Sequence, residues 1–494
     1  MMDYMTAKEA AEKWGVTVRQ VQSGCENGRI ENAARMGYMW LIPKNAPKPV
    51  DGRTKAAKQR KQLTRKVGDN PMCNHYELRL YDTTLLTFEL TAGELGGYAA
   101  NITNIGEPRK LLPLDLELTG DGMMKWLERR VIPKNRTFVE EILKSFGLST
   151  GDTKGIIDVC KGLSLNDSYW IVPEGFEGKF ADFNLYENRF SEILSLVAYT
   201  GVSQSDAAFS TSPELTTNGM LPKAWRFIDG EGIFLYKGGT SGFANTGKEP
   251  YCEFYASQVA ETMNLNAVNY SLENWKGILA SKCKLFTDID TSFIPIGRII
   301  KSGGITAVAG YYDNLGGQYA DSLRDMLVLD ALIYNEDRHF GNFGLLRDNK
   351  TGEITAPAPI FDNGISLFSL AMPEDYANLD EYAKTRFPAY PNTTFEGICK
   401  AFITARQVEK LRKMLNFSFT RHPKLNLPES HLAAIEKHLR KRASRLIGLS
   451  RSKEHRLDSI PEPTLREEIE AAKQETESKP RNTSTHVKTD MGID

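Results

Sequence analysis

A chain of 494 residues is too long for a single hydrophobic core, because domains of about 150 residues are the norm, so we expect roughly two to four domains. Hydrophobic residues make up 41% of the chain and charged residues 25%, which excludes a chain that is disordered throughout. The formal net charge is -1, so the overall charge favours no nucleic-acid, membrane or acidic partner.

The first residues and the cysteines both predict a cytoplasmic protein. Lys and Glu interrupt every apolar run from Met1 to Trp14, which argues against a secretory signal peptide. No stretch approaches the roughly 20 apolar residues of a membrane span, so we expect no membrane partner. The six cysteines lie far apart, without a C-x-x-C pair or metal-ligand spacing, and are interpreted as reduced thiols: Cys25, Cys73, Cys160, Cys252, Cys283 and Cys399.

Residues 1–50 have the pattern of two short helices followed by a hairpin. Thr6, with Glu9 three residues later, predicts a capping-box helix start. A tight turn at 15–17 offers Thr17 as a second cap, and a helix over 18–25 follows. Residues 28–30 and 36–43 predict a small hairpin that ends in an apolar strand.

This layout resembles the winged helix-turn-helix of excisionase and MerR-type regulators. The resemblance implies that the second helix enters the major groove of DNA and brings Arg19, Gln20 and Gln22 closest to the bases. We expect DNA binding through residues 1–66 and a homodimer on a palindromic operator; a three-helix protein-interaction domain is the alternative. The basic residues that would contact phosphates are Lys44, Lys48, Arg53, Lys55, Lys58, Arg60, Lys61, Arg65 and Lys66.

The part of the chain from 51 to 200 shows no chemical constellation. Residues 51–75 are predicted to be a basic linker, and residues 76–200 a supporting N-terminal subdomain with a helix over 138–146. Polar and aromatic residues gather at 163–170 and 182–186. We interpret these two clusters as turns pinned by Asn and Asp side chains, with a binding surface as the alternative.

An apolar run over residues 233–237 has the pattern of a buried hairpin strand that ends in Lys237. A lysine at this position usually extends its ammonium group to water or pairs with an acid. The functional alternative is a cation over the α- and β-phosphates of ATP. A helix is predicted from Glu249 to Ala260, with Glu253 in its first turn. Glu253 either complements the helix dipole or holds Lys237 by an ion pair, as the helical glutamate of protein kinases does.

Ionisable residues follow a strongly apolar helix predicted over 324–334. Four residues separate Asp337 from Asn342, the spacing between the catalytic Asp and the Mg²⁺-binding Asn in the catalytic loop of protein kinases. A carboxylate there can accept the proton of an attacking hydroxyl while the amide oxygen holds a metal ion that bridges the phosphates.

A second acidic motif follows the apolar run 358–361, which we predict to be a strand. Asp362 comes directly after this run, where a hard oxygen ligand suits Mg²⁺, although a β-turn Asp is the alternative. Either acidic motif alone is a weak signal. Together, Lys237, Glu253, Asp337 with Asn342, and Asp362 occur in the order of the kinase motifs.

Residues 335–344 (NEDRHFGNFG) and 359–364 (PIFDNG) resemble the catalytic core of the HipA-like serine/threonine kinases. In that family the order Asp-Arg-His replaces the His-Arg-Asp of eukaryotic kinases. The resemblance implies an α+β fold of the bilobal, protein-kinase-like (HipA-type) kind. Its N-lobe would span residues 201–320 and its C-lobe residues 321–450.

The resemblance also assigns roles to individual residues. Asp337 would be the catalytic base, Asn342 and Asp362 the Mg²⁺ ligands, and Lys237 the phosphate-binding lysine. His339 of the Asp-Arg-His sequence would belong to the ATP site. ATP and Mg²⁺ are thus the expected cofactors.

Residues 217–223 resemble the glycine-containing nucleotide loop of the same family. The resemblance places Gly219 and Lys223 at the bound ATP, next to a region where autophosphorylation can regulate activity. The DNA-binding module is fused to the kinase here, whereas HipA-type toxins usually have it in a separate antitoxin partner. The candidate autophosphorylation sites are Ser210, Thr211, Ser212, Thr216 and Thr217.

The C-terminal end predicts one more helix and a tail. A helical pattern over 432–449 would close the larger lobe, and the charged residues 451–494 predict a disordered tail. The sequence as a whole predicts an ATP-dependent serine/threonine protein kinase, of unknown protein substrate, fused to a DNA-binding module. Two alternatives stay open: a DNA-binding regulator whose kinase fold senses nucleotide, and a small-molecule phosphotransferase.

Overall fold

The computed structural model describes residues 4–26, 30, 33–36, 39–44, 46, 48, 74–93, 97–202, 212–242 and 245–457. The predicted basic linker up to Cys73, the candidate sites Ser210 and Thr211, and the predicted tail beyond Leu457 lie outside these residues. The chain divides into two compact units. Unit 1 comprises Met1–Phe254, Val268–Ile299 and Gly344–Pro359, and unit 2 comprises Tyr255–Ala267, Ile300–Phe343 and Ile360–Asp494.

The N-terminal helices of unit 1 begin at the predicted caps. Thr6 accepts a hydrogen bond from the Glu9 backbone, and the Glu9 carboxylate accepts one from the Thr6 backbone (2.6 Å), which is the capping box. Gly15 ends the first helix in the left-handed region, at φ 63°. A hairpin forms, but its first strand lies at Ala34–Met36 rather than at the predicted 28–30. A strand that the sequence did not reveal, β1, pairs with it in the order β1-β3-β2. These elements are β1 (Tyr4–Thr6), α1 (Ala7–Trp14), α2 (Val18–Glu26), β2 (Ala34–Met36) and β3 (Met39–Pro43).

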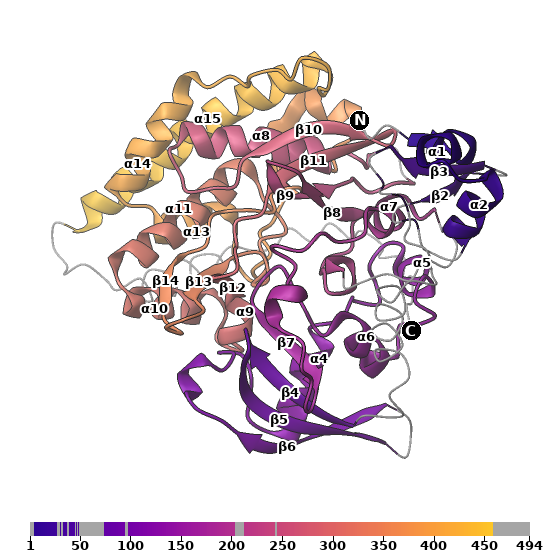
Figure 1. The fold of residues 1–494 in the computed structure, drawn as a ribbon. Helices are drawn as coiled ribbons and strands as arrows, with labels where there is room; N and C mark the ends of the chain where they lie inside the picture. The colour runs from indigo at the N-terminus through magenta and orange to yellow at the C-terminus, as the bar shows by residue number, and fades with distance from the viewer. Residues whose placement is uncertain are drawn as a thin grey trace. The chain divides into compact units, whose positions relative to one another are not determined.

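A four-stranded antiparallel sheet follows in unit 1, in the order β6-β5-β4-β7. Apolar side chains alternate along β5 and are buried from Leu86 to Leu90 at every second position, because successive side chains of a strand point to opposite faces. Helix α4 lies next to this sheet (Figure 1) and packs against β6. Trp126 of α4 is buried in the same core as Leu86, Phe88 and Leu90. The bounds are β4 (His75–Leu80), β5 (Thr83–Ala92), β6 (Tyr98–Ile105), α4 (Gly120–Glu128) and β7 (Tyr169–Pro173).

A second four-stranded antiparallel sheet carries the predicted strand that ends in Lys237. Its order is β10-β11-β9-β8, and helix α7 packs against β8. Buried residues on this sheet include Ala224, Tyr236 and Ala280. The bounds are α5 (Val139–Lys144), α6 (Thr153–Cys160), α7 (Glu192–Thr200), β8 (Lys223–Ile228), β9 (Gly232–Lys237), α8 (Glu249–Thr262), β10 (Tyr270–Trp275) and β11 (Ile278–Lys284).

A three-stranded sheet in the order β12-β13-β14 completes unit 1. Arg347 of β13 is 2% exposed and donates hydrogen bonds to the carbonyl of Leu112 (3.0 Å) and the hydroxyl of Tyr169 (2.7 Å). These bonds tie the small sheet to β7 and to the segment before α4. The bounds are β12 (Thr291–Pro295), α9 (Ile296–Ile299), β13 (Gly344–Asp348) and β14 (Ile354–Pro357).

Unit 2 is helical among its described residues, except for an isolated parallel bridge between Ala267 and Ile360. Its central helix, α11, is buried along most of its length and packs against α10 and α13. Most of α8 also belongs to this unit. The bounds are α10 (Gly304–Leu315), α11 (Gly317–Ile333), α12 (Leu379–Ala383), α13 (Phe395–Phe402), α14 (Ala405–Arg412) and α15 (Glu429–Leu457).

Several predicted elements differ from the structure. The helix predicted over 324–334 begins seven residues earlier, because α11 runs from Gly317 to Ile333. Residues 358–361 do not form the predicted strand; β14 ends at Pro357, and only the Ala267–Ile360 bridge occurs in this run. Pro359 has no N–H to donate, so a ladder cannot continue through it. The predicted last helix is longer at both ends, because α15 starts at Glu429 and ends at Leu457. Residues 451–457, which the sequence assigned to the disordered tail, are therefore helical.

The described residues contain no helix that is both long enough and apolar enough to cross a membrane. Five of the six cysteines are described, and all five are buried and form no disulfide; Cys73 lies outside the described residues. The interpretation as thiols agrees with this finding for the described five.

Candidate functional site

Lys237 and Glu253 form a buried ion pair within unit 1. Lys237 is the last residue of β9 and is 8% exposed, and its Nζ lies 2.9 Å from Oε1 of Glu253, which is fully buried in α8. The sequence placed Glu253 in the first turn of its helix, but α8 begins at Glu249, so Glu253 is the fifth residue. A buried carboxylate is costly without a cation, so the pair fixes the position of the lysine ammonium.

A second buried lysine lies beside Lys237 on the same sheet face. Lys223 is the residue of β8 directly opposite Lys237 in the antiparallel register, and opposite residues share a face. Lys223 is 6% exposed, and its Nζ donates to the carbonyl of Asn218 (2.8 Å). Gly219, at φ 90°, leaves room for this ammonium group, because a Cβ there would lie 2.2 Å from Lys223 Nζ. The structure therefore brings the three residues of the predicted phosphate site, Lys237, Lys223 and Gly219, to one face of this sheet.

Arg136 of unit 1, a residue that sequence reasoning missed, makes hydrogen bonds to both ends of the turn that contains Gly219. Its guanidinium pairs with the fully buried Glu214 and donates to the carbonyls of Glu214 (2.8 Å) and Lys223 (3.0 Å). Glu214 in turn accepts a hydrogen bond from the backbone of Trp225 (2.7 Å). The two ends of the predicted nucleotide loop are therefore held by one arginine.

Three of the candidate autophosphorylation residues are described, and two of them are buried. Ser212 is 1% exposed and accepts a hydrogen bond from the Glu214 backbone, and Thr216 is 4% exposed and donates to the carbonyl of Leu163 (2.8 Å). Thr217 is half-buried and donates to the carbonyl of Pro213 (2.6 Å). All three hydroxyls take part in hydrogen bonds in this conformation.

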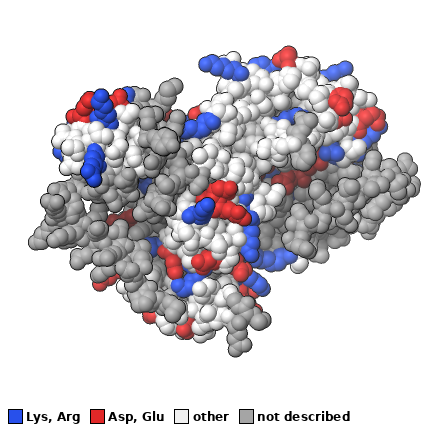
Figure 2. Space-filling view, turned by 90° about the vertical axis from the view of Figure 1, so that its right-hand side faces the viewer, with Lys and Arg blue, Asp and Glu red and all other residues white. Residues whose placement is uncertain are grey.

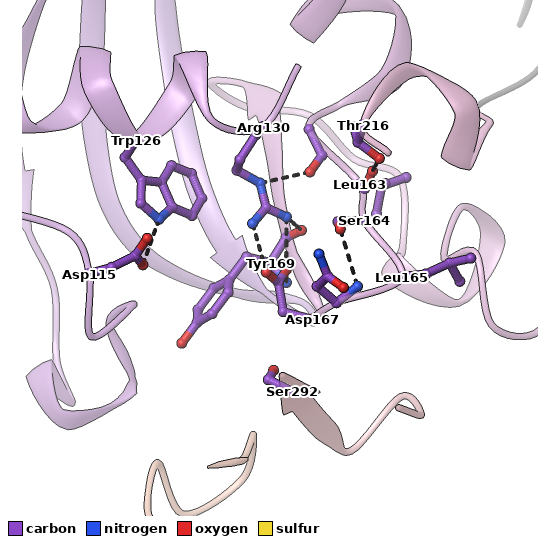
Figure 3. A network of polar contacts seen from close by, with 12 residues as sticks. Asp115, Trp126, Arg130, Leu163, Ser164, Leu165, Asp167, Tyr169, Thr216 and Ser292 are labelled. Carbon is purple, nitrogen blue, oxygen red and sulfur yellow. Dashed lines mark hydrogen bonds and ion pairs between the residues drawn. The ribbon is translucent and has the colours of Figure 1, made fainter. Parts of the chain in front are cut away.

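The turn interpreted from residues 163–170 is pinned by an acidic side chain, as expected (Figure 3). Asp167 accepts a hydrogen bond from the Tyr169 backbone (3.0 Å) and two from Arg130 (both 2.8 Å). The Arg130 guanidinium also lies 4.5 Å from the ring of Trp126. This network supports the turn whose Leu163 carbonyl holds Thr216.

The predicted catalytic loop begins where α11 ends, within unit 2. Tyr334 ends the helix in the left-handed region, at φ 55°. Asp337 is exposed. Its backbone N–H donates a hydrogen bond to the Asn335 side chain (3.1 Å), and its carbonyl accepts one from Asn342 Nδ2 (2.9 Å). The main chain therefore fixes Asp337 and leaves its carboxylate at the surface. His339 is also exposed and accepts from the backbone of Gly341 (3.0 Å).

Arg338 is the buried centre of this loop. It is 1% exposed and forms a bidentate pair with Asp330 of α11 (2.9 and 3.1 Å). Burial raises the pKa of the Asp330 carboxyl, and the guanidinium opposes that shift. Arg338 also donates to the carbonyls of Asn342 (3.0 Å) and Phe361 and to the side chain of Asn363 (2.5 Å). We call Arg338, Asp330, Asn335 and Asn363 the Arg338 network.

The Arg338 network brings the two predicted metal ligands to one loop cluster. Asn335 Nδ2 lies 3.5 Å from the carbonyl of Asp362, and Arg338 contacts the residues on both sides of Asp362. Asp362 adopts a left-handed φ of 57°, a conformation that is rare for residues other than glycine and gathers at functional sites. Because Asn342 uses its amide nitrogen in the loop, its amide oxygen is the atom that can bind a cation.

These residues fit a magnesium ion that is shared with phosphates. The described residues contain no cluster of three or more His, Cys, Asp or Glu side chains that could hold a metal ion by itself. Mg²⁺ commonly takes only one or two carboxylates from the protein and completes its shell with phosphate oxygens and water. One carboxylate and one amide oxygen match this pattern.

The predicted DNA-reading residues lie on the surface of α2. Arg19, Gln20 and Gln22 are all exposed. Gln20 also takes part in the helix cap, because its side-chain oxygen accepts hydrogen bonds from the backbone N–H (2.9 Å) and the hydroxyl (3.0 Å) of Thr17. On the face shown in Figure 2, Lys and Arg are interspersed with Asp and Glu among the described residues, so charge alone marks no binding surface there.

Comparisons with known proteins give one sequence relative. No protein-family model matches the chain. Over 135 residues, 24% of this chain and 41% of the relative, the sequence is 28% identical to the serine/threonine-protein kinase CtkA of Helicobacter pylori. Part of the chain is thus similar to a kinase. The match covers less than half of the length of that curated relative.

Matches among solved structures include two at low sequence identity. A crystal structure of the proinflammatory kinase CtkA of Helicobacter pylori matches over 94% of its chain and 49% of this one, at a TM-score of 0.39 and 19% identity. The HipA toxin–antitoxin complex of Shewanella oneidensis, with HipB and operator DNA, matches over 97% of its chain and 76% of this one, at a TM-score of 0.48 and 14% identity.

Proposed function

We propose that this chain is an ATP-dependent serine/threonine protein kinase of the HipA-like type. The observation that carries the proposal is the Arg338 network, which holds Asp337, Asn342 and Asp362 in one loop cluster while the Asp337 carboxylate stays exposed. The buried Lys237–Glu253 pair and the sequence similarity to CtkA support it.

The reaction assigns one task to each residue. Lys237, with Lys223 and the Gly219 turn, binds the phosphates of ATP, and His339 contributes to the nucleotide site. Asn342 and Asp362 would hold Mg²⁺, and the ion would neutralise charge on the phosphates. Asp337 accepts the proton of a substrate Ser or Thr hydroxyl. The hydroxyl oxygen forms a bond to the γ-phosphorus of ATP, and the bond between the γ-phosphorus and the ADP oxygen breaks.

The test is transfer of label from γ-labelled ATP to protein in the presence of Mg²⁺. Wild-type protein is expected to label itself or an added protein on Ser or Thr, and Lys237→Met is expected to lower the rate about 100-fold, because the phosphates lose a fixed cation. Lys125→Met, which removes an exposed lysine from α4, is the control and should keep the wild-type rate.

Two results would count against the kinase. Absence of label in wild-type protein that binds Mg-ATP tightly would favour a regulator that senses nucleotide. Label on a small-molecule acceptor, with none on protein, would favour the small-molecule phosphotransferase.

We also propose that residues 1–66 bind DNA, and the exposed face of α2 favours this. Arg19 and Gln22 keep their side chains at the surface, whereas Gln20 is engaged at the helix cap. A homodimer would match the symmetry of a palindromic operator. The HipA complex that resembles this chain contains operator DNA and HipB, but those partners belong to that protein.

Arg19→Ala is expected to weaken binding to a specific duplex about tenfold, because one arginine contact to a base is worth on the order of 1–3 kcal/mol. The duplex is first selected from a random-sequence pool with the full chain, and affinity is then measured by fluorescence anisotropy. Lys8→Ala, at an exposed position of α1, controls for the loss of one positive charge. Equal affinities for all three proteins would remove Arg19 from the interface, and failure to select any duplex would count against DNA binding.

A further inference from the structure

A cavity of about 290 Å³ opens beside the catalytic loop, and it lies wholly within unit 2. Its walls come from the loop, from the first turn of α10, from residues 389–393 and from α13. The larger side chains that line it are Ile305, His339, Phe340, Tyr390, Ile398 and Phe402.

The volume of the cavity is larger than that of an ordinary packing defect. Protein interiors are close-packed, and voids larger than one water molecule are few. An apolar cavity of about 150 Å³ is already large enough to bind benzene. A cavity of about 290 Å³ therefore has room for one large apolar side chain of a ligand together with part of its adjoining backbone.

The lining selects for apolar groups. His339 and Tyr390 are its only titratable side chains among the described residues, and no Asp, Glu, Lys or Arg contributes to it. Burial raises the pKa of the Tyr390 phenol well above its usual value, so the tyrosine is neutral. Its hydroxyl is buried and has no hydrogen-bond partner among the described residues. A peptide would supply both an apolar side chain and backbone groups that can pair with a hydroxyl.

The cavity lies close to Asp337, because His339 lines it. His339 is two residues along the chain, and its N–H donates to the Asp337 carbonyl (2.8 Å), so the two Cα atoms lie within about 7.6 Å, the span of two peptide units. An extended peptide advances about 3.3–3.6 Å per residue. If the hydroxyl of a substrate residue reaches Asp337, a residue one or two positions away reaches the cavity.

We propose that this cavity is a specificity pocket for an apolar side chain within two residues of the phosphorylated Ser or Thr. The occupant is thus a protein substrate with Leu, Ile, Met or Phe at that flanking position. The inference rests on the proposed kinase function and adds the class of substrate to it.

The test uses the full chain, Mg²⁺, labelled ATP and a peptide library. Each peptide has one central Ser or Thr, and each of the two residues on either side is fixed in turn to every amino acid. Wild-type protein is expected to prefer apolar residues over Gly or Asp at one flanking position by roughly tenfold or more, the discrimination that apolar pockets reach.

Two opposite substitutions of one lining residue make the test specific. Thr393 is half-buried in the lining, so Thr393→Asp should shift the preference at that position toward Lys and Arg, and Thr393→Lys should shift it toward Asp and Glu. Thr355→Asp, at an exposed position of β14 outside the cavity, should keep the apolar preference. Thermal denaturation of each variant confirms that it is folded.

The outcomes separate the pocket from the kinase. Labelled peptides without a flanking preference, or the same preference in both Thr393 variants, would overturn the pocket and leave the kinase in place. Absence of label on every peptide and on the protein itself would overturn the proposed kinase function and the pocket with it.

Discussion

Arg338→Met is expected to destabilise unit 2 by about 3–5 kcal/mol, because removal of one partner leaves a buried charge without compensation. Asp330 has 5% of its side chain exposed and would lose its bidentate partner. The carbonyls of Asn342 and Phe361 would lose their donor as well. Kinase activity is expected to fall with stability, since the loop would no longer be held against the Asp362 turn.

A double variant separates the two effects. Arg338→Met with Asp330→Leu removes both charges, and apolar replacement of a buried pair is often neutral or stabilising. We therefore expect the double variant to recover much of the stability but not the activity, because neither new side chain can hold the loop carbonyls. Arg412→Met, at an exposed position of α14, is the control.

Hydrogen exchange of the α11 amides is the appropriate measurement of stability. All six tryptophans belong to unit 1, so tryptophan fluorescence does not report on unit 2. Faster exchange along α11 in the single variant, with near wild-type exchange in the double variant, is the expected pattern. A single variant with wild-type exchange would show that the pair contributes little, and a double variant with wild-type activity would show that the network does not position the loop.

Features that depend on neighbouring residues could be predicted from the sequence. The capping box of Thr6 and Glu9 joins residues three apart, and the helix follows from it. Asp337 and Asn342 belong to one loop, so their spacing is visible without a fold, and the structure joins them by a hydrogen bond. The assignment of these residues to catalysis remains a prediction.

Features that depend on contacts between distant segments could not be predicted. Arg136 pairs with Glu214, 78 positions away, and neither residue belongs to a recognisable motif. Asp330 lies in an apolar helix, where the sequence drew attention to the leucines around it. The signal that could have been used is the charge itself, because a buried acid inside an apolar run requires a cation nearby.

The strand predicted over 358–361 failed for a different reason. Its apolar residues fit a buried strand, but Pro359 cannot donate to a ladder. The structure instead shows a bridge at Ile360, an irregular approach to Asp362 and a left-handed backbone at Asp362 itself. The strained residue is the one that the sequence had selected as a metal ligand, which agrees with the tendency of functional sites to depart from regular structure.

Asp337→Asn is expected to lower the rate of phosphoryl transfer about 1000-fold, within the range of 10²–10⁴ that a positioned base contributes. The substitution keeps the size of the side chain and removes its ability to accept a proton. Two hydrogen bonds of Asp337 use its backbone N–H and carbonyl, so they persist in the variant. Stability and Mg-ATP affinity are therefore expected to stay at wild-type values.

The measurement combines initial rates of label transfer with Mg-ATP affinity from calorimetry, and Asp121→Asn, at an exposed position of α4, is the matched control. Because the side chain of Asp337 is exposed, a loss of rate in the folded variant cannot come from a buried unpaired group. A rate within tenfold of wild type would exclude Asp337 as the base. A loss of Mg-ATP affinity equal to the loss of rate would instead make Asp337 a residue of the nucleotide or metal site, and the base would have to be another residue of the loop.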